Sequence, residues 1–209
     1  MKIVKQFLAV GILVLLLSCN NNSNLKSPNN NKTQQSFEFP APKGWTTEKI
    51  EFPISFAPQI PYNGYESLCF SPEWEYVKSD QHWAYAFVWW LNDNPDINAE
   101  SLQQNMSLYY TGLLNSNIEK RNIPQADMIT PTATIIKIAT EPGDKETYSG
   151  SIKMLDYLDL LHPAISLNCL IHKKDCSNHV ALLFQIAPKP FNHSVWNQLN
   201  ELNKSFSCK

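Results

Sequence analysis

The stretch from Trp83 to Leu91 constrains the fold more than any other, because all nine of its residues are apolar or aromatic. A helix needs about 20 such residues to span a membrane, so this stretch is too short for that role. A strand that is apolar on both faces must be covered on both faces. We therefore predict a central strand over residues 82–91, with one layer of structure above it and another below. With a period of two, one face carries Trp83, Tyr85, Phe87, Trp89 and Leu91, and the other carries Ala84, Ala86, Val88 and Trp90.

The first nineteen residues have the parts of a targeting signal. Two lysines precede an apolar run from Phe7 to Leu17, which is too short to cross a membrane. The run Leu16-Leu17-Ser18-Cys19 resembles the lipobox of bacterial lipoproteins, although leucine is a less common residue directly before the serine. The resemblance implies that residues 1–18 are removed and that Cys19 carries covalent lipid. A plain secretory peptide is the alternative.

A polar segment rich in asparagine follows, and Leu25 is its one aliphatic residue. Such a composition cannot bury enough surface to offset the entropy lost on ordering. We expect residues 19–36 to be the lipidated cysteine and a flexible tether with a root-mean-square span of roughly 23 Å. Acyl chains on Cys19 would hold the protein on a membrane, since each buried methylene contributes about 0.8 kcal/mol. Some Gram-negative lipoproteins carry acidic residues just after the cysteine that direct them to the cell surface. None stands here, so the resemblance implies an orientation toward the periplasm.

Residues 37–209 have the composition of a single globular domain. Across the chain 43% of residues are hydrophobic and 17% are charged, as in ordinary folded proteins. The formal net charge is −2, and no basic run or basic helix face occurs. A nucleic-acid partner is therefore not expected.

Hydrophobic periodicity predicts several strands, a helix, more strands and a last helix. The predicted strands cover residues 46–52, 65–70, 82–91, 132–139, 147–155, 165–172 and 179–187, with an irregular or edge segment over 37–45. The first helix is capped by Asn98 and has an apolar stripe of Leu102, Met106, Tyr109 and Leu113. The last helix is capped by Asn192 or Ser194, and its stripe is Val195, Leu199, Leu202 and Phe206. Periodicity does not decide between strand and helix for residues 156–163.

The economical fold is of the α+β class, a mostly antiparallel sheet of about six or seven strands with two main helices packed on it. This order of elements, together with the Gly44-Trp45 start, resembles the PsbP-like superfamily. The resemblance implies an α/β sandwich and an accessory or binding domain, since most members are not enzymes.

Two cysteines and two histidines lie within the eleven residues from Cys169 to His179. Thiolate and imidazole groups are preferred ligands of Zn²⁺, so His172, Cys176 and His179 are candidate metal ligands. If the two histidines pair across a hairpin, strand alternation puts both on the face opposite Cys169. That arrangement argues against a single ion held by all four side chains.

Disulfide formation is the other reading of the cysteines, because many bacterial envelopes are oxidising. Setting Cys19 aside, the candidates are Cys69, Cys169, Cys176 and Cys208. They allow three complete pairings, and the sequence does not choose among them. A link between Cys169 and Cys176 would close one hairpin, and Cys208 could reach Cys69.

Motifs of catalysis are missing from the sequence. There is no nucleophile elbow, no zinc-protease helix, no phosphate-binding loop and no dinucleotide-binding turn. Asp156 and Asp159 lie near His162, a grouping that we interpret as an exposed turn.

Aromatic residues are abundant in the first half of the domain. Trp45, Tyr62, Tyr65 and Trp74 lie in or near proline-rich loops and are candidates for a ligand-binding surface. The alternative is that these rings fill the core.

We therefore expect a membrane-anchored envelope lipoprotein that binds an envelope protein and needs no cofactor beyond the lipid on Cys19. One alternative is an enzyme without a recognisable local motif. Another is a metal-binding protein that uses the hairpin from Cys169 to His179.

Overall fold

The computed structural model describes residues 36–124, 128–161 and 163–209, without the side chain of residue 119. The expected signal sequence, Cys19 and nearly all of the expected tether lie outside these residues. No helix within the described ranges is long and apolar enough to cross a membrane.

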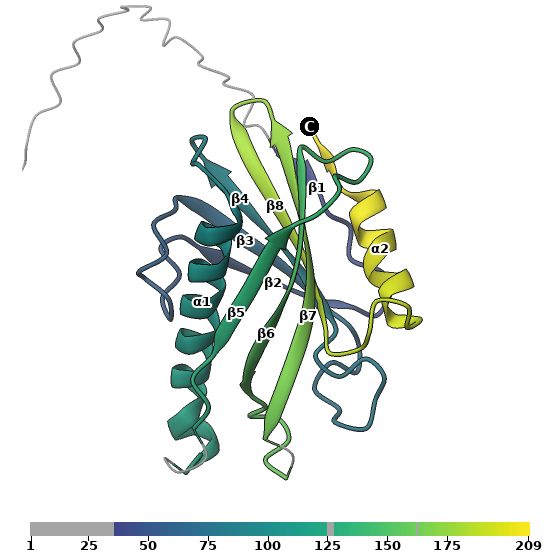
Figure 1. Ribbon diagram of the computed structural model, residues 1–209. Coiled ribbons are helices and arrows are strands. Elements are labelled where there is room, and N and C mark those ends of the chain that lie inside the picture. Colours follow the sequence, from purple (N-terminus) through teal and green to yellow (C-terminus); the bar gives the residue numbers. More distant parts are fainter. Residues whose placement is uncertain (1–35, 125–127, 162) are drawn as a thin grey trace, which may run out of the picture. The chain divides into compact units, whose positions relative to one another are not determined.

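Seven antiparallel strands form the main sheet in the order β2-β3-β4-β8-β7-β6-β5 (Figure 1). Their bounds are β2 (Thr46–Glu51), β3 (Gly64–Phe70), β4 (Tyr85–Asn92), β5 (Thr132–Lys137), β6 (Glu146–Leu155), β7 (Ala164–Cys176) and β8 (His179–Ala187). A second sheet pairs β1 (Phe37–Glu38) with β9 (Ser207–Cys208), near the two ends of the described chain. The helices are α1 (Ala99–Arg121) and α2 (Val195–Ser205), which lie on opposite faces of the main sheet. The predicted α+β class is confirmed.

β4 is an interior strand that is buried on both faces, as the sequence predicts. The residues from Trp83 to Leu91 at odd positions join the large core under α1. Ala84 and Ala86 pack with α2, while Val88 and Trp90 join a third cluster that Phe37 and Phe206 cover. The alternating apolar residues from Trp83 to Leu91 therefore account for a layer of structure on each face of the sheet.

α1 begins where the sequence predicts and ends later. The Asn98 side chain accepts a hydrogen bond from the backbone N–H of Ser101 at 3.0 Å, which is an N-cap. The helix runs on to Arg121, about two turns beyond Leu113, the last residue of the predicted apolar stripe. It ends at Asn122 with φ of 51°, and the backbone N–H of Ile123 bonds to the Ile118 carbonyl at 3.1 Å. This is a Schellman ending with asparagine in the left-handed position.

The β7–β8 hairpin is longer than predicted, because β7 continues through the charged residues Lys173 to Asp175. Cys176 pairs directly with His179, so the connection is only Ser177 and Asn178. Buried carboxylates explain how these polar residues join a strand. Lys173 donates to Glu146 at 2.8 Å, and Lys174 donates to Asp144 at 2.7 Å.

α2 follows the predicted stripe, with Val195, Leu199 and Leu202 buried against the sheet. Ser194 occupies the N-cap position but makes no side-chain capping bond to any described residue. Phe206 lies just beyond the helix in extended backbone and packs in the third cluster.

Residues 156–161, which periodicity left undecided, form a turn after β6. Asp156 anchors it. Its buried carboxylate accepts hydrogen bonds from His82 Nε2 at 2.8 Å and Trp83 Nε1 at 2.9 Å, and from the backbone N–H of Leu158 at 2.9 Å.

Candidate functional site

A groove of about 530 Å³ opens between the C-terminal half of α1 and the β2 side of the sheet. α1 packs mainly over β5 and β6, at the other end of the same sheet face. The groove is lined by seven aromatic residues: Phe56, Phe70, Trp74, Trp83, Tyr85, Tyr109 and Tyr157. Its other lining residues are Thr46, Thr47, Glu48, Ile50, Leu68, Leu113, Ser116, Asn117 and Lys120.

Local periodicity explains why these side chains meet. Glu48, Ile50, Leu68 and Phe70 occupy alternate positions of two paired strands and therefore share a face. Leu113, Ser116, Asn117 and Lys120 follow the three- and four-residue spacing of one helix face. The strands supply the floor of the groove and the helix supplies a wall.

The aromatic rings in the groove hold one another in place. Trp74 contacts Phe70 with ring centroids 4.8 Å apart, and it meets Trp83 edge to face at 6.0 Å. Tyr157 contacts the same Trp83 ring at 5.1 Å. Trp83, Tyr85, Tyr109 and Tyr157 are buried. A ligand that docks here would therefore meet mainly the partly exposed rings of Phe56, Phe70 and Trp74, which are already ordered, and this lowers the entropy cost of binding.

The groove lies beside an open sheet edge. The N–H of Phe52 bonds inward to the carbonyl of Gly64 at 3.0 Å. Because antiparallel pairs alternate, the backbone groups of Thr47, Lys49 and Glu51 point outward from β2. No described residue bonds to these outward groups.

The opposite edge, β5, is covered. The N–H of Ala133 donates to Ser107 Oγ at 3.1 Å, and the N–H of Ile135 donates to Gln103 Oε1 at 3.4 Å. Side chains of α1 therefore satisfy the outward donors of β5. Among the described residues nothing equivalent protects β2.

The four aromatic residues proposed from the sequence as a ligand surface do not form one surface. Trp74 lines the groove. Tyr62 is buried, and its hydroxyl accepts a hydrogen bond from Asn105 at 2.8 Å. Trp45 packs beside the α2 core, and Tyr65 belongs to the third cluster, so both lie on the other face of the sheet. Tyr62 is thus a core residue, whereas Trp45 and Tyr65 are partly buried.

Sequence reasoning did not connect Tyr85, Tyr109 or Tyr157 with a ligand-binding surface. Tyr85 lies in β4, Tyr109 in α1 and Tyr157 in the turn after β6. The spacing of Leu113, Ser116, Asn117 and Lys120 along one helix face was the available signal. Only the sheet order, however, reveals what that face meets.

A buried carboxyl group lies on the same face of the sheet as the groove. Glu66 on β3 is fully buried, and Tyr109 Oη donates to its Oε1 at 3.0 Å. Burial raises the pKa of Glu66 to about 8, against the opposing effect of the Tyr109 hydrogen bond and the nearby Trp89 indole. The carboxyl is therefore mostly protonated at neutral pH.

The cysteines pair differently from both links considered above. Cys176 forms a disulfide with Cys208, with their Cα atoms 5.5 Å apart. Cys69 and Cys169 are buried free thiols in the α2-side and α1-side cores. Burial raises the pKa of each thiol to about 12, so neither supplies a thiolate at neutral pH.

The predicted metal ligands His172, Cys176 and His179 do not gather around one point. Cys176 is in the disulfide, and the ring of His179 stacks on Trp90 at 4.7 Å. His172 instead lies with Glu141 and Asp144, whose ligand atoms and Nδ1 are all within 4.8 Å of one another.

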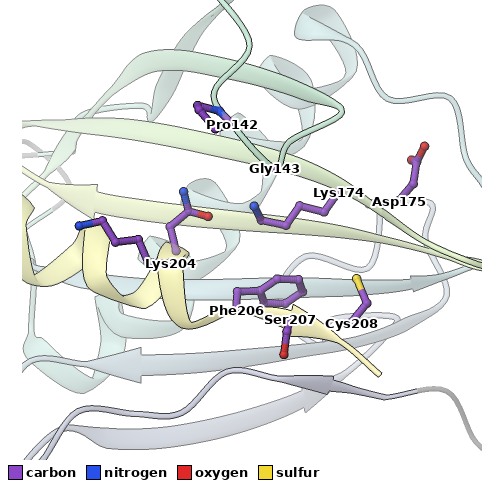
Figure 2. Close-up of a pocket in the computed structure, with 9 residues that line it drawn as sticks. Pro142, Gly143, Lys174, Asp175, Lys204, Phe206, Ser207 and Cys208 are labelled. Carbon is purple, nitrogen blue, oxygen red and sulfur yellow. The ribbon is translucent and has the colours of Figure 1, made fainter.

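A pocket of about 330 Å³ opens beside this group, between the turn that carries Gly143 and the C-terminal end of α2. Figure 2 shows Pro142 and Gly143 on one side of it, Phe206 on the other, and Lys174 between them. A second pocket, of about 470 Å³, lies on the other side of Asn203 and includes Glu141.

The expected turn after β6 is exposed at Leu160 and Leu161 but buried at Asp156 and Tyr157, and its described residues offer no prepared nucleophile. His82, which bonds to Asp156, has a second ring nitrogen that no described residue contacts by a hydrogen bond. Asp159 accepts the backbone N–H of Leu161 at 3.1 Å, while His162 lies outside the described residues. The pair of Asp156 and His82 therefore holds the turn onto the sheet.

No protein-family model and no curated protein sequence matches this chain. Its structure is similar to the solution structure of cyanobacterial PsbP (CyanoP) from Synechocystis, with 10% identity and a TM-score of 0.40 over 83% of this chain and 86% of that chain. It is also similar to LpqN, involved in cell envelope biogenesis of Mycobacterium tuberculosis, with 11% identity and a TM-score of 0.34 over 84% of each chain.

Proposed function

We propose that the mature chain is a membrane-anchored lipoprotein of the bacterial cell envelope, and that it is a non-catalytic binding domain for an extended segment of another envelope protein. The observation that carries the proposal is the aromatic groove beside the uncovered edge of β2. The lipobox-like run before Cys19 supports the anchor.

The chemistry of the lining residues supports binding rather than catalysis. Histidine, cysteine and arginine are not among them, and their acidic and basic side chains are Glu48 and Lys120. Burial raises the pKa values of Tyr85 and Tyr109 well above the ordinary tyrosine value, so neither is a base at neutral pH. General acid–base catalysis needs groups that titrate near the working pH.

The geometry favours an extended peptide as the occupant. A strand added to β2 would bond to the outward backbone groups of Thr47, Lys49 and Glu51. Its alternate side chains would then lie against Trp74 and the neighbouring rings. The charges of Lys49 and Glu51 also keep this edge from pairing with unrelated strands.

Site-specific photocrosslinking in living cells tests this function. A photoreactive residue replaces Ser116, which lines the groove, or its neighbour Asn115, which is exposed outside it. We expect a discrete crosslinked envelope protein from position 116 and not from position 115. The same adduct from both positions, or from neither, would contradict a groove-bound partner.

A backbone variant then tests strand addition. Thr47→Pro removes an outward N–H without removing a bond to β3, whereas Thr47→Val keeps that N–H. We expect the proline variant to reduce the crosslink from position 116 several-fold and the valine variant to leave it unchanged. Equal crosslinking by both variants would mean that the partner does not bond to the β2 backbone.

The anchor is tested separately by fractionation. Cys19→Ser removes the thiol that would carry lipid, so we expect the protein to move from the membrane pellet to the soluble fraction. Metabolic labelling with a fatty-acid analogue should mark the wild type alone. Continued pelleting of the unlabelled variant would contradict lipid anchoring.

A further inference from the structure

On the face of the sheet opposite the aromatic groove, we propose a binding site for a divalent transition-metal ion, with Zn²⁺ as the best fit. Its ligands are Glu141, Asp144, His172 and Asn203. Of the three metal ligands predicted from the sequence, only His172 belongs to this site. Oxygen ligands take the place of Cys176 and His179. It is independent of the proposed binding function.

Three ligand atoms already converge. His172 Nδ1 is 2.7 Å from Asp144 Oδ2 and 3.8 Å from Glu141 Oε2. Ligand atoms at about 2.1 Å from a tetrahedral Zn²⁺ are roughly 3.4 Å apart. One of the two measured distances is shorter than this value and the other is longer. Small movements of the side chains would therefore allow an ion to bind all three atoms.

The tautomer of His172 is set for metal binding. The side-chain amide of Gln185 donates to the Leu199 carbonyl at 2.6 Å, so the Gln185 oxygen is the atom that faces His172 Nε2 at 3.1 Å. Nε2 must then carry a proton, and Nδ1, which hydrogen-bonds to Asp144 Oδ2 at 2.7 Å, is the ring nitrogen that a metal ion would bind in place of a proton. Metal-bound histidines are held by such a bond from the other ring nitrogen.

Asn203, on α2, offers a fourth ligand to this group. Its amide nitrogen lies 3.2 Å from His172 Nδ1, and its buried oxygen has no hydrogen-bond partner among the described residues. A half-turn of this amide brings the oxygen to the same place as the nitrogen. The oxygen would then be a fourth ligand.

The surroundings hold the ligands without blocking the ion. Thr147 Oγ1 donates to Asp144 Oδ2 at 2.6 Å, and Lys174 Nζ bonds to the other carboxylate oxygen at 2.7 Å. Asp144 and His172 are buried, whereas the Glu141 side chain is 44% exposed. Glu141 and Asn203 both line the larger neighbouring pocket, which gives an ion a way in.

Isothermal titration of the chelator-treated mature protein with Zn²⁺ tests the site. We expect saturable one-to-one binding that Glu141→Gln weakens by at least about 10-fold, as loss of even an outer contact to a metal ligand commonly does. Glu141 is partly exposed, and no described residue donates a hydrogen bond to its carboxylate, so this variant should fold normally. The matched control is Glu201→Gln, which changes an exposed acid on the same pocket and should bind as the wild type does.

Thermal unfolding gives a second readout, because a metal that binds only the folded state raises the midpoint. Zn²⁺ should raise the midpoint of the wild type and of Glu201→Gln more than that of Glu141→Gln. Absence of saturable binding at millimolar Zn²⁺ would overturn the proposal, and so would equal affinity of Glu141→Gln and the wild type. Either result would leave the cluster as an ion pair that joins the turn to β7.

Discussion

Glu66 is a carboxyl group buried in the core without a cation beside it. Tyr109 is its one hydrogen-bond partner among the described residues, and the second oxygen has none. The charged form is therefore much less stable here than in water, and burial raises the pKa from 4.5 to about 8. This residue should make the stability of the domain depend on pH.

The direction of that dependence follows from proton binding. Between pH 4.5 and about pH 8 the folded state keeps the Glu66 proton while the unfolded state loses it. The free energy of unfolding should therefore fall as pH rises through this range, by a few kcal/mol in total, and level off above it. Urea unfolding at a series of pH values measures this slope.

Glu66→Gln provides the comparison, because the amide has the size of the carboxyl group and does not ionise. Its unfolding free energy should fall less than that of the wild type between pH 5 and pH 9. The exposed substitution Glu201→Gln, on α2 and the other face of the sheet, should keep the wild-type slope. Parallel curves for the wild type and Glu66→Gln would show that Glu66 is ionised in the folded state at neutral pH.

At the scale of elements, α1 contains a glycine that its contacts require. A glycine inside a helix is normally less stable than alanine by roughly 0.5–1 kcal/mol. At Gly112, however, a Cβ atom would overlap the backbone carbonyl of Phe56, which is part of the groove lining. The missing side chain lets the loop before β3 lie directly against the helix.

Gly112→Ala should therefore destabilise the domain by about 1–3 kcal/mol, the usual cost of overpacking, rather than stabilise it. Chemical denaturation measures the change. Gln104→Ala, at an exposed position of the same helix, should change the stability by less than about 0.5 kcal/mol. A gain in stability from Gly112→Ala would mean that the loop does not rest on α1.

At the scale of the whole molecule, one disulfide joins the end of the chain to the main sheet. Cys208 belongs to β9, which pairs with β1, and Cys176 ends β7. The bond closes a loop with a sequence separation of 32 residues. It thus holds the two-stranded sheet near the third core cluster, at the point where the chain from the expected anchor enters the described domain.

Cys208→Ser should lower the free energy of unfolding by about 2–4 kcal/mol, because the unfolded chain loses the constraint of a closed loop. Reductant should lower the stability of the wild type by a similar amount and leave the variant unchanged. Limited proteolysis should cleave the variant first near its ends. If the oxidised wild type and the variant have the same free energy of unfolding, the disulfide does not stabilise the domain.

Local patterns predict much of this architecture. Trp83 to Leu91 alternate between two apolar faces, Asn98 caps a helix, and Pro188 follows the last strand of the sheet. Each signal depends on residues that are neighbours in the sequence, whose relative positions the backbone geometry already sets. The α+β class follows from adding such signals together.

Predictions from local patterns are less accurate where a contact between residues far apart in the sequence determines the secondary structure. Lys173 to Asp175 lie beyond the predicted strand over residues 165–172. They belong to β7 because Glu146 and Asp144 bind the two lysines. The apolar stripe predicts α1 only as far as Leu113, because the role of Asn122 as the terminating residue was not recognised. In the first case a tertiary contact outweighs propensity, and in the second a helix-ending signal was present in the sequence but missed.

The sequence by itself determined the class of the fold, the two-faced central strand and the lipobox-like start of the chain. Only the tertiary structure decided that Cys176 bonds to Cys208, that His172 meets Asp144 from 28 residues away, and that α1 leaves an aromatic groove beside β2. The physical reason is that periodicity reports which way a side chain faces. What that side chain meets depends on the order of strands and the packing of helices, which no single segment encodes.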